Sequence, residues 1–510
     1  MGMVAFVAEH TAPQPCSPAK AGAQTGHPPS RVNILLPFAA LAMILITLAL
    51  LRPVDHDESQ YVAAALLTAH GLLPYKDFAY LQTPLQPYLF APIAALASTW
   101  TWPALRITNA LLGAATIAAV HRAARIGGAS TRTATIATAL FATCDILLFS
   151  IGTARNDALP AACLALALPA IVRTARDQAS RCDAVLIGLL LAAAATAKIS
   201  YVLPALTYGI WTLFSRNRRP WWTLLGAMPF ALFTLALFAA SPEGFLFGVL
   251  GFPRQAPTEW YQSRPWKLSN SVKIIDTLKF LALGPALLAI VATTGRRQRW
   301  HLILDLLILA GLIAALAPVP TWRQYLLPVL PALFVRLALV WHAHPPGKAM
   351  RIAATVFACA GLAPTIEAVA SGRIPMLDAM RDASSARQTL DREHIAGPVA
   401  TLSPQFLPGR AIDPHFATGP FYFRSTALLD ARQEYTLHLV SQARTHLLGY
   451  PSAILTGGEG AWSSGDDQID AVLAAYARHH GYRAVSVPGT RFTLYVARRV
   501  SLRPAPHNNP

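Results

Sequence analysis

Apolar runs as long as a membrane span recur through the first 370 residues, and they limit what the chain can fold into. Crossing the hydrocarbon core of a bilayer takes roughly 20 mainly apolar residues in a helix. The 510 residues are 54% hydrophobic and only 13% charged, whereas soluble domains carry about 25% charged residues. We therefore expect an α-helical polytopic membrane protein. Eleven spans are predicted, at residues 33–51, 104–120, 133–151, 157–173, 184–198, 201–215, 221–240, 276–294, 301–318, 324–341 and 351–369.

The basic residues orient these spans. A net charge of +17 would suit nucleic-acid binding in a soluble protein, but in a membrane protein Lys and Arg mark the cytoplasmic loops. Placing the five basic loops in the cytoplasm makes the predicted spans alternate correctly. Residues 52–103, 152–157, 241–275, 319–323 and everything after 370 then lie on the outer side. We expect a multi-pass protein of a bacterial inner membrane with a cytoplasmic N-terminus.

Composition divides the chain into three parts. Residues 1–32 are rich in Pro, Ala, Gly and Ser and are predicted to be a disordered cytoplasmic tail, followed by a membrane domain over 33–369. Shorter apolar runs and turn residues then predict a small periplasmic α/β domain over 370–510. Residues 86–99 are too short for a comfortable crossing, and we expect a helix at the outer face there. The C-terminal domain is predicted to hold strands at 399–402, 453–455, 483–487 and 491–496, and helices at 433–448 and 466–480.

Acidic residues crowd the point where the first predicted span ends, in the sequence Asp55-His56-Asp57-Glu58. Ionisable groups beside a bilayer are costly unless they face water, a partner or a substrate. A helix N-cap is one explanation, since acidic side chains satisfy free N–H groups and suit the helix dipole. Neighbours on a helix point about 100° apart, so we expect only one of Asp57 and Glu58 in a given site. Asp57 shares its face with Tyr61.

A second acidic position, Arg155-Asn156-Asp157, lies between the third and fourth predicted spans. Asp157 alone could be an N-cap, with Pro160 tolerated in the first helical turn. The two acidic positions nevertheless fall at the same depth on the same side of the membrane. One shared site explains them better than two independent caps.

Short motifs are spread over residues 33–340, namely Asp57-Glu58-x-x-Tyr61, Gly71-x-x-Pro74-Tyr75-x-Asp77, Thr83-Pro84-Leu85, Arg106, Arg155-Asn156-Asp157 and Arg323-Gln324-Tyr325-Leu326-Leu327-Pro328. With them the chain resembles the integral-membrane GT-C glycosyltransferases. The similar branch is the family 39-type group of protein O-mannosyltransferases, aminoarabinose transferases and rhizobial galacturonosyltransferase-like proteins. Many of these have Lys- or His-Pro-Pro-Leu where this chain has Thr83-Pro84-Leu85.

The resemblance implies a GT-C fold and inverting transfer of a sugar from a polyprenyl-phosphate donor to an acceptor hydroxyl at the outer face. A hydroxyl is a weak nucleophile, so a nearby carboxylate acts as general base, with Asp57 the first candidate and Glu58 the second. Asp157 would orient the acceptor or, with Asp57, hold a divalent cation such as Mg²⁺ or Mn²⁺. The acceptor would be an envelope glycan, lipid or protein.

The leaving group of such a reaction is a lipid phosphate, whose developing charge needs cationic groups. Arg323 is the first candidate, because it lies in a very short outer loop and its guanidinium can fork onto phosphate. Each cation could instead simply reach the membrane interface. The candidates are Lys76, Arg155, Lys198, Arg254, Lys267, Lys273 and Arg323, and the resemblance adds Tyr61, Tyr75, Asp77 and Tyr325 to the substrate-binding set.

Other interpretations stay open at this point. Loop 241–275 combines aromatic and basic residues, which suits a sugar phosphate or an interfacial anchor equally. A transporter or lipid-linked sugar flippase is the main alternative, although it would place polar groups near the bilayer midplane on broken helices. A non-catalytic membrane sensor is a further alternative, in which the outer-loop carboxylates would be dispensable.

Overall fold

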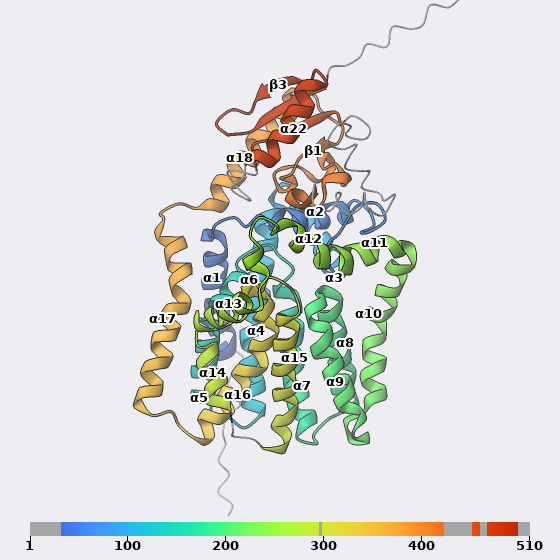
Figure 1. Cartoon of the computed structure of the whole chain (residues 1–510). Helices are drawn as coiled ribbons and strands as arrows, with labels where there is room; N and C mark the ends of the chain where they lie inside the picture. The colour runs from blue at the N-terminus through green and yellow to red at the C-terminus, as the bar shows by residue number, and fades with distance from the viewer. Residues whose placement is uncertain (1–31, 295–297, 423–450, 459–466, 498–510) are drawn as a thin grey trace, which may run out of the picture.

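The structure, a computed structural model, describes residues 32–294, 298–422, 451–458 and 467–497. A helical bundle forms its lower part, and a smaller domain with a β-sheet lies above it (Figure 1). Helices suit these apolar runs because a helix in a bilayer satisfies its backbone groups internally. The unbroken helices of the bundle are α1 (Val32–Leu51), α4 (Thr101–Ile126), α7 (Ala158–Ala175), α8 (Arg181–Ala197), α9 (Val202–Leu213), α10 (Pro220–Ala240), α15 (Leu302–Leu316), α16 (Leu330–Ala343) and α17 (Lys348–Ala370).

In the described part of the chain, six segments are long and apolar enough to span a membrane, or eight if each of two bent helix pairs counts as one span. This finding confirms a polytopic helical membrane protein but not the predicted count of eleven. Helices α5 (Thr131–Ala142) and α6 (Asp145–Ile151) bend by 67°, and α13 (Asn270–Ala282) and α14 (Ala286–Thr293) by 94°. The second bend falls at Gly284, whose φ of +128° suits only glycine.

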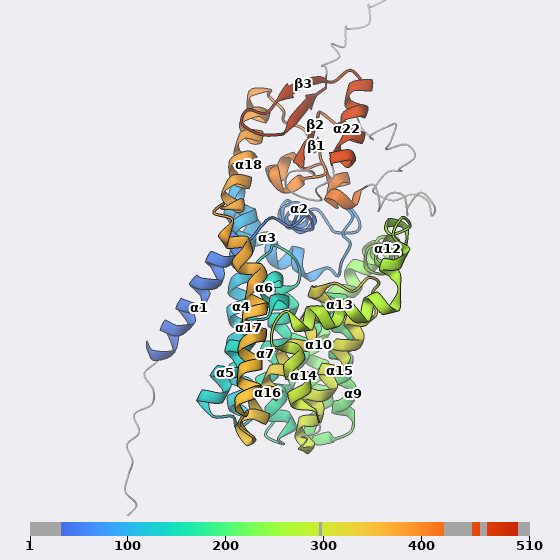
Figure 2. The ribbon, with the colours of Figure 1, turned by 60° about the vertical axis from the view of Figure 1, so that its left-hand side comes forward.

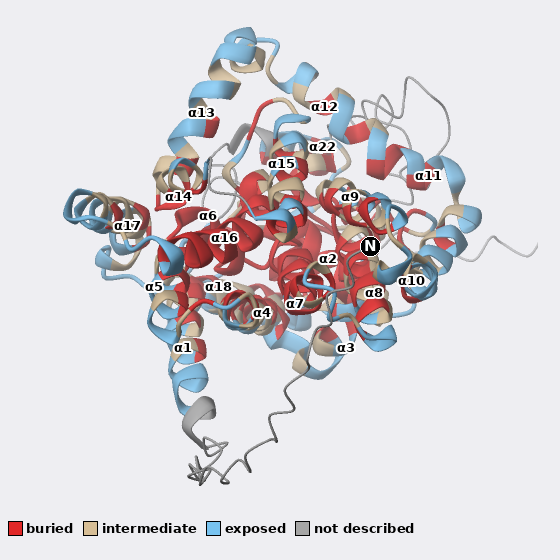
Figure 3. Ribbon diagram, turned by 90° about the horizontal axis from the view of Figure 1, so that it is seen from below, coloured by how far each residue is buried: buried red, intermediate tan, exposed pale blue. Residues whose placement is uncertain are grey.

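The bundle has a buried centre and an exposed rim, as Figure 3 shows from below. The span that contains α16 is 89% buried and α7 is 83% buried, whereas α10 and α17 are only 17% buried. Large apolar side chains on the rim, such as Leu232 of α10 and Val356 of α17, are exposed. In a membrane these side chains meet acyl chains, so the rim has the surface of a lipid-facing helix layer.

The upper domain contains a four-stranded mixed sheet in the order β1-β2-β4-β3. Strand β1 (Val399–Ala400) runs parallel to β2 (Ala453–Thr456), and β4 (Thr493–Val496) pairs antiparallel with both β2 and β3 (Arg483–Ser486). Helix α22 (Asp467–His479) packs on β2. The four predicted strands and the predicted helix at 466–480 are thus present. The predicted helix at 433–448 lies outside the described residues, as does the predicted tail up to residue 31.

Helix α2 (Glu58–Ala69) joins the bundle to the upper domain. It lies between them with α3 (Leu85–Ala97), as Figures 1 and 2 show. Apolar side chains of α2 share one hydrophobic core with the sheet and with α18 (Pro375–Arg392), an amphipathic helix that the sequence analysis did not anticipate. The start of α2 is therefore held from both sides. Helix α3 covers the apolar stretch expected at the outer face, and its place at the membrane surface stays a prediction.

Candidate active site

One buried guanidinium, that of Arg155, gathers carboxylates from two separate segments of the chain. Arg155 lies between α6 and α7, and its side chain is 6% exposed. Its Nη1 donates to Asp55 Oδ1 at 2.8 Å and also pairs with Asp57, while its Nε donates to Asp157 Oδ2 at 3.2 Å. The structure thus brings the two acidic positions of the sequence analysis against a single cation.

Neither Asp57 nor Asp157 caps its helix with its side chain. Both stand at N-cap positions, of α2 and α7, yet neither carboxylate accepts a first-turn N–H. Asp57 forms an ion pair with His56, with Nε2 and Oδ1 3.0 Å apart, in addition to its contact with Arg155. Asp157 pairs with Lys198, which follows α8. Capping therefore does not account for these two carboxylates, and the charged contacts do.

The charges around Asp57 and His56 shift both pKa values. Burial opposes ionisation of Asp57, but Arg155 and His56 outweigh it and hold the pKa of Asp57 well below its usual range. The Asp57 carboxylate raises the pKa of His56 to about 9 against the effect of burial. At neutral pH Asp57 is therefore ionised and His56 protonated. The His56 side chain is 44% exposed, so the cluster opens to solvent on that side.

Three guanidinium groups surround the ring of Phe149 on α6. The guanidinium carbon of Arg323 lies 3.7 Å from the ring centroid, that of Arg52 5.1 Å and that of Arg155 5.4 Å. Arg323 also donates to Asp145 at 2.8 Å, and Arg52 lies 3.8 Å from the same carboxylate. An aromatic face attracts cations and holds them without neutralising their charge. The ring itself adds no negative charge, and carboxylates, Asp145 among them, balance part of the positive charge of this group.

Tyrosines and a lysine border the same cluster. Lys198 Nζ lies 5.5 Å from the ring centroid of Tyr325, which follows Arg323 closely in the chain. Tyr61, one turn beyond Asp57, is 2% exposed. Burial raises the pKa of Tyr61, with Arg155 opposing and Asp57 adding to the effect. Its hydroxyl stays protonated and can donate a hydrogen bond.

Glu58 stands outside this open cluster and holds it together. Its carboxylate is fully buried and accepts two hydrogen bonds from Arg106 of α4, at 2.8 and 2.7 Å. It also accepts the backbone N–H of Ala154, while Arg106 donates to three backbone carbonyls at the end of α1. Glu58 and Ala154 are the chain neighbours of Asp57 and Arg155. The buried hydrogen bond between Glu58 and Ala154 therefore places the side chains of Asp57 and Arg155 next to each other.

Three predicted substrate-binding residues, Tyr75, Lys76 and Asp77, lie together in a turn, and their contact with a substrate stays a prediction. Tyr75 is buried, with a φ of +68°, and donates its hydroxyl to a backbone carbonyl at 2.5 Å. Asp77 accepts the backbone N–H of Leu73 at 2.7 Å and closes the same turn. Lys76 between them is exposed. The motif Gly71-x-x-Pro74-Tyr75-x-Asp77 thus fixes the conformation of the chain between α2 and α3.

The basic residues of loop 241–275 also lie apart from the Arg155 cluster. Arg254 is exposed on α12 (Phe252–Trp260), and Lys267 lies over the ring of Trp266 at 5.1 Å from its centroid. Lys273 donates to a backbone carbonyl at the end of α15. Among the described residues, none of these three cations pairs with a carboxylate. The choice between a substrate contact and an interfacial anchor stays open for them.

Several members of the cluster were missed by the sequence analysis. Asp145 lies within the predicted span 133–151, and an ionisable residue inside an apolar run is itself a signal of function. Arg52 follows the first span directly, where charge bias alone suggests only orientation. Phe149 carries no signal in the sequence, because a phenylalanine in an apolar run is ordinary. Asp55 and His56 belong to the acidic segment that the sequence shows, but no functional role was predicted for either.

The predicted divalent cation between Asp57 and Asp157 does not fit this arrangement. Mg²⁺ and Mn²⁺ need carboxylate oxygens that other charges leave free. Arg155 pairs with both carboxylates, and Lys198 takes the second oxygen of Asp157. Asp55, His56 and Asp57 do offer ligand atoms within 4.8 Å of one another, but Arg155 engages both aspartates. Protein cations thus supply the positive charge here, and metal dependence stays a prediction.

Comparison with known proteins identifies the fold. No family model and no curated protein sequence matches the chain. The chain is similar to the crystal structure of ArnT from Cupriavidus metallidurans bound to undecaprenyl phosphate, with a TM-score of 0.59, 15% identity and coverage of 92% of this chain and 99% of that chain. The apo structure of the same protein gives a TM-score of 0.52, 14% identity and coverage of 91% and 98%. The likeness shows that the chain shares the fold of this ArnT structure.

Glu58→Gln should destabilise the protein strongly, because it leaves the buried Arg106 guanidinium without its carboxylate. Breaking one side of a buried ion pair costs roughly 3–5 kcal/mol. We expect the midpoint of thermal unfolding in detergent to fall by several degrees. Asp378→Asn, which breaks an exposed pair with Arg381, is the control and should leave the midpoint nearly unchanged. An unaltered midpoint in Glu58→Gln would contradict the stabilising role of the buried Glu58–Arg106 pair.

His56→Gln should change how stability depends on pH. The folded-state pKa of His56 is raised from 6.5 to about 9, so its stabilising effect is complete below about pH 6.5 and is lost as the pH rises through 9. The gap in unfolding midpoint between the natural protein and His56→Gln should therefore be widest below pH 6.5 and close above pH 9. The exposed His342→Gln should follow the natural protein throughout. A gap that does not vary with pH would disprove the His56–Asp57 coupling.

Proposed function

We propose that this protein transfers a sugar from a polyprenyl-phosphate donor to an acceptor hydroxyl at the outer face of the membrane, with inversion at the anomeric carbon. The observation that supports it is the meeting of an ionised carboxylate, Asp57, with the guanidinium groups around Phe149. Such a transfer needs a base for the hydroxyl and cations for the leaving phosphate. The similar ArnT structure holds undecaprenyl phosphate, which supports a donor of that class.

The balance of charge in the cluster favours an anionic ligand. With His56 protonated, four carboxylates face five cationic groups, so one positive charge is left over. Arg323 is the most exposed of the three guanidinium groups at 29%, against 10% for Arg52 and 6% for Arg155. A phosphate would therefore meet Arg323 first. The groups counted are Asp55, Asp57, Asp145 and Asp157 against Arg52, His56, Arg155, Lys198 and Arg323.

The donor phosphate also releases the base in this proposal. A phosphate bound at Arg323 competes for Arg155, which then shares its charge between the phosphate and Asp57. Because Arg155 holds the pKa of Asp57 down, the weakened contact lets that pKa rise toward its ordinary range. Asp57 becomes a better proton acceptor only when the donor is in place. A resting enzyme without donor thus keeps its base neutralised.

In the transfer step the acceptor oxygen bonds to the anomeric carbon while Asp57 takes the hydroxyl proton. The bond from that carbon to the phosphate oxygen breaks, and the polyprenyl phosphate leaves with the electron pair. The guanidinium groups stabilise the negative charge that develops on it. Attack and departure on opposite sides of the carbon in one displacement give inversion.

The roles of the remaining acidic residues follow from their contacts. Glu58 is fully buried and bound twice by Arg106, so it cannot reach an acceptor, and the base role falls to Asp57 alone. Asp157 pairs with both Arg155 and Lys198 and positions them. The buried Tyr61 hydroxyl stays protonated next to Asp57 and Arg155.

Placement of the cluster supports a surface reaction rather than transport. The segments before α2 and after α6 lie at the upper end of the bundle, next to the upper domain (Figure 1). Charge bias puts this end at the periplasmic face of a bacterial inner membrane. Transporters and flippases bind their cargo near the midplane. The acceptor in this proposal is a hydroxyl of an envelope glycan, lipid or protein.

Asp57→Asn should abolish most of the transfer while leaving the protein folded. The amide keeps the shape of the side chain but cannot accept the proton, and loss of a general base costs typically ~10²–10⁴-fold in rate. The assay is product formation from a synthetic polyprenyl-phosphate sugar by purified protein, with the thermal midpoint as a check of folding. Asp177→Asn, an exposed residue far from the cluster, is the control. Turnover close to that of the natural protein would remove Asp57 from the base role.

Arg323→Ala should weaken binding of the donor far more than binding of the acceptor. The change removes the most exposed guanidinium that could contact the phosphate. Arg323→Lys should restore only part of the donor affinity, because an ammonium group cannot form two parallel hydrogen bonds to a phosphate. We expect a donor KM raised roughly tenfold or more, with the acceptor KM little changed. Arg132→Ala, exposed at the start of α5, serves as the control. An unchanged donor KM would count against the phosphate site.

A further inference from the structure

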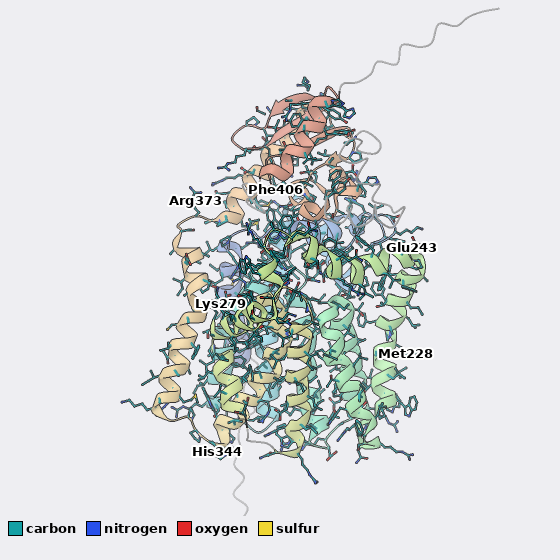
Figure 4. The ribbon with its side chains drawn as sticks, viewed as in Figure 1. Met228, Glu243, Lys279, His344, Arg373 and Phe406 are labelled. Carbon is teal, nitrogen blue, oxygen red and sulfur yellow. The ribbon has the colours of Figure 1, made fainter. Side chains whose placement is uncertain are left out.

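A cavity of about 100 Å³ lies between the bundle and the upper domain, on the side of α2 away from the Arg155 cluster. Its walls are α2, α18, the short 3-10 turn Ser98–Trp100 with the first residues of α4, and segment 405–408. Figure 4 labels Phe406 of this wall at the junction of the two parts, and Figure 2 shows α18 rising beside α2 toward the upper domain. We call it the rim cavity. None of the residues assigned to the transfer reaction lines it.

Two buried polar side chains in the wall have no partner. Gln405 is 5% exposed, and neither its Oε1 nor its Nε2 makes a hydrogen bond within the described part of the chain. Trp102 is 2% exposed, and its indole N–H is likewise unpaired. A buried polar group without a partner is costly, and native proteins seldom keep one without a purpose. Together the two side chains offer three N–H donors and one carbonyl oxygen to a ligand of matching polarity.

The charge of the wall points to an anion. Arg387 of α18 is the cationic residue among those that line the cavity, and it forms no ion pair with a carboxylate of the described residues. The hydroxyl-bearing Ser384 stands one helical turn before it on the same face. A half-buried guanidinium beside a hydroxyl and an amide is an arrangement that binds phosphate oxygens. The cavity therefore suits a phosphate that carries further hydroxyl groups.

Apolar surface leads from the cavity onto the lipid-facing side of the bundle. Val62 and Leu66 of α2 line the cavity itself. Just before the turn Ser98–Trp100, Leu96 of α3 is 89% exposed, and Trp100 within the turn is 61% exposed. Exposed tryptophan is typical of the level where headgroups meet acyl chains. A ligand here would have a polar, anionic end in the cavity and an apolar end along α3.

We propose that the rim cavity binds the anionic headgroup of a membrane phospholipid that bears hydroxyl groups. Arg387 and Ser384 contact its phosphate, and Gln405 and Trp102 contact the hydroxyls. The acyl chains lie along α3. Bound lipid would then bridge α2, α18 and the segment after β1, and so strengthen the attachment of the upper domain to the bundle. This inference does not depend on the proposed transfer reaction.

The test measures the thermal unfolding midpoint of the purified full chain in detergent micelles that contain added lipid. Phosphatidylglycerol, which is anionic and has free hydroxyls, should raise the midpoint in a saturable way. Phosphatidylcholine and inorganic phosphate at the same concentration should raise it much less. Equal shifts from phosphatidylcholine would overturn the anionic headgroup. An equal shift from inorganic phosphate alone would show a site for a soluble anion and overturn the lipid.

Two variants locate the effect. Arg387→Gln should raise the phosphatidylglycerol concentration for half of the shift by about tenfold or more, as loss of a charge-assisted contact predicts. Gln405→Leu should lose most of the shift, although it removes an unpaired buried group and so should not lower the midpoint without lipid. Arg381→Gln on the same helix, outside the cavity, should respond like the natural protein. An unchanged response in Arg387→Gln, with a midpoint in the absence of lipid equal to that of the natural protein, would overturn the proposal.

Discussion

The geometry of the candidate site depends on one buried ion pair, Glu58 with Arg106. No atom of either side chain is exposed, and each is bound several times: Glu58 by Arg106 and a backbone N–H, Arg106 by Glu58 and three carbonyls. A buried pair of this kind adds little to stability on balance but is very costly to break. The pair is therefore suited to fixing the position of the start of α2 relative to α4 and to the segment that contains Ala154. Asn109, one turn further along α4, holds the backbone on both sides of Ala154 at 2.7 and 2.8 Å and supports the same segment.

Electrostatic neutralisation is the second theme of the site. Asp57 is ionised yet tied to Arg155 and protonated His56, which makes it a weak base in the resting state. Such a carboxylate gains basicity only when another anion takes over its partner. A lipid-linked phosphate has the right charge for this exchange, and the guanidinium groups stacked around Phe149 give it a place to bind. In the proposed reaction, donor binding and activation of the base are one event, which would protect the donor from hydrolysis by stray water.

Much of the fold could be predicted from the sequence, because hydrophobic periodicity and charge bias act locally. Long apolar runs predicted the helices, and short alternating runs predicted the strands of the upper domain. The number of spans could not be settled in this way, since the bend at Gly284 and the break before Asp145 divide apolar runs that composition shows as continuous. Helix α18 was missed although its amphipathic pattern is a local signal; it packs on segment Pro404–Phe406 and on α1, which lies more than 300 residues away in the chain.

For the site, the sequence indicated the residues but not their partners. Asp57, Asp157 and Arg155 stand out as charges next to apolar runs, and depth in the membrane suggested that they meet. In the sequence, the adjacent residues Asp57 and Glu58 looked equivalent. The structure distinguishes them, because the Asp57 carboxylate is partly exposed whereas that of Glu58 is buried against Arg106. The convergence of Arg52 and Arg323 on Phe149 depends on how three helices pack, which no local pattern encodes.

The most direct test of the account is whether purified protein makes a glycosidic bond. A synthetic polyprenyl-phosphate sugar of known anomeric configuration is mixed with detergent-solubilised protein and an extract of cell-envelope acceptors. Detergent removes the two sides of a membrane, so transport cannot imitate transfer. The account predicts a new glycoside whose anomeric configuration is opposite to that of the donor. Failure to form any glycoside from a panel of polyprenyl-phosphate sugars, or a product that retains the donor configuration, would contradict it.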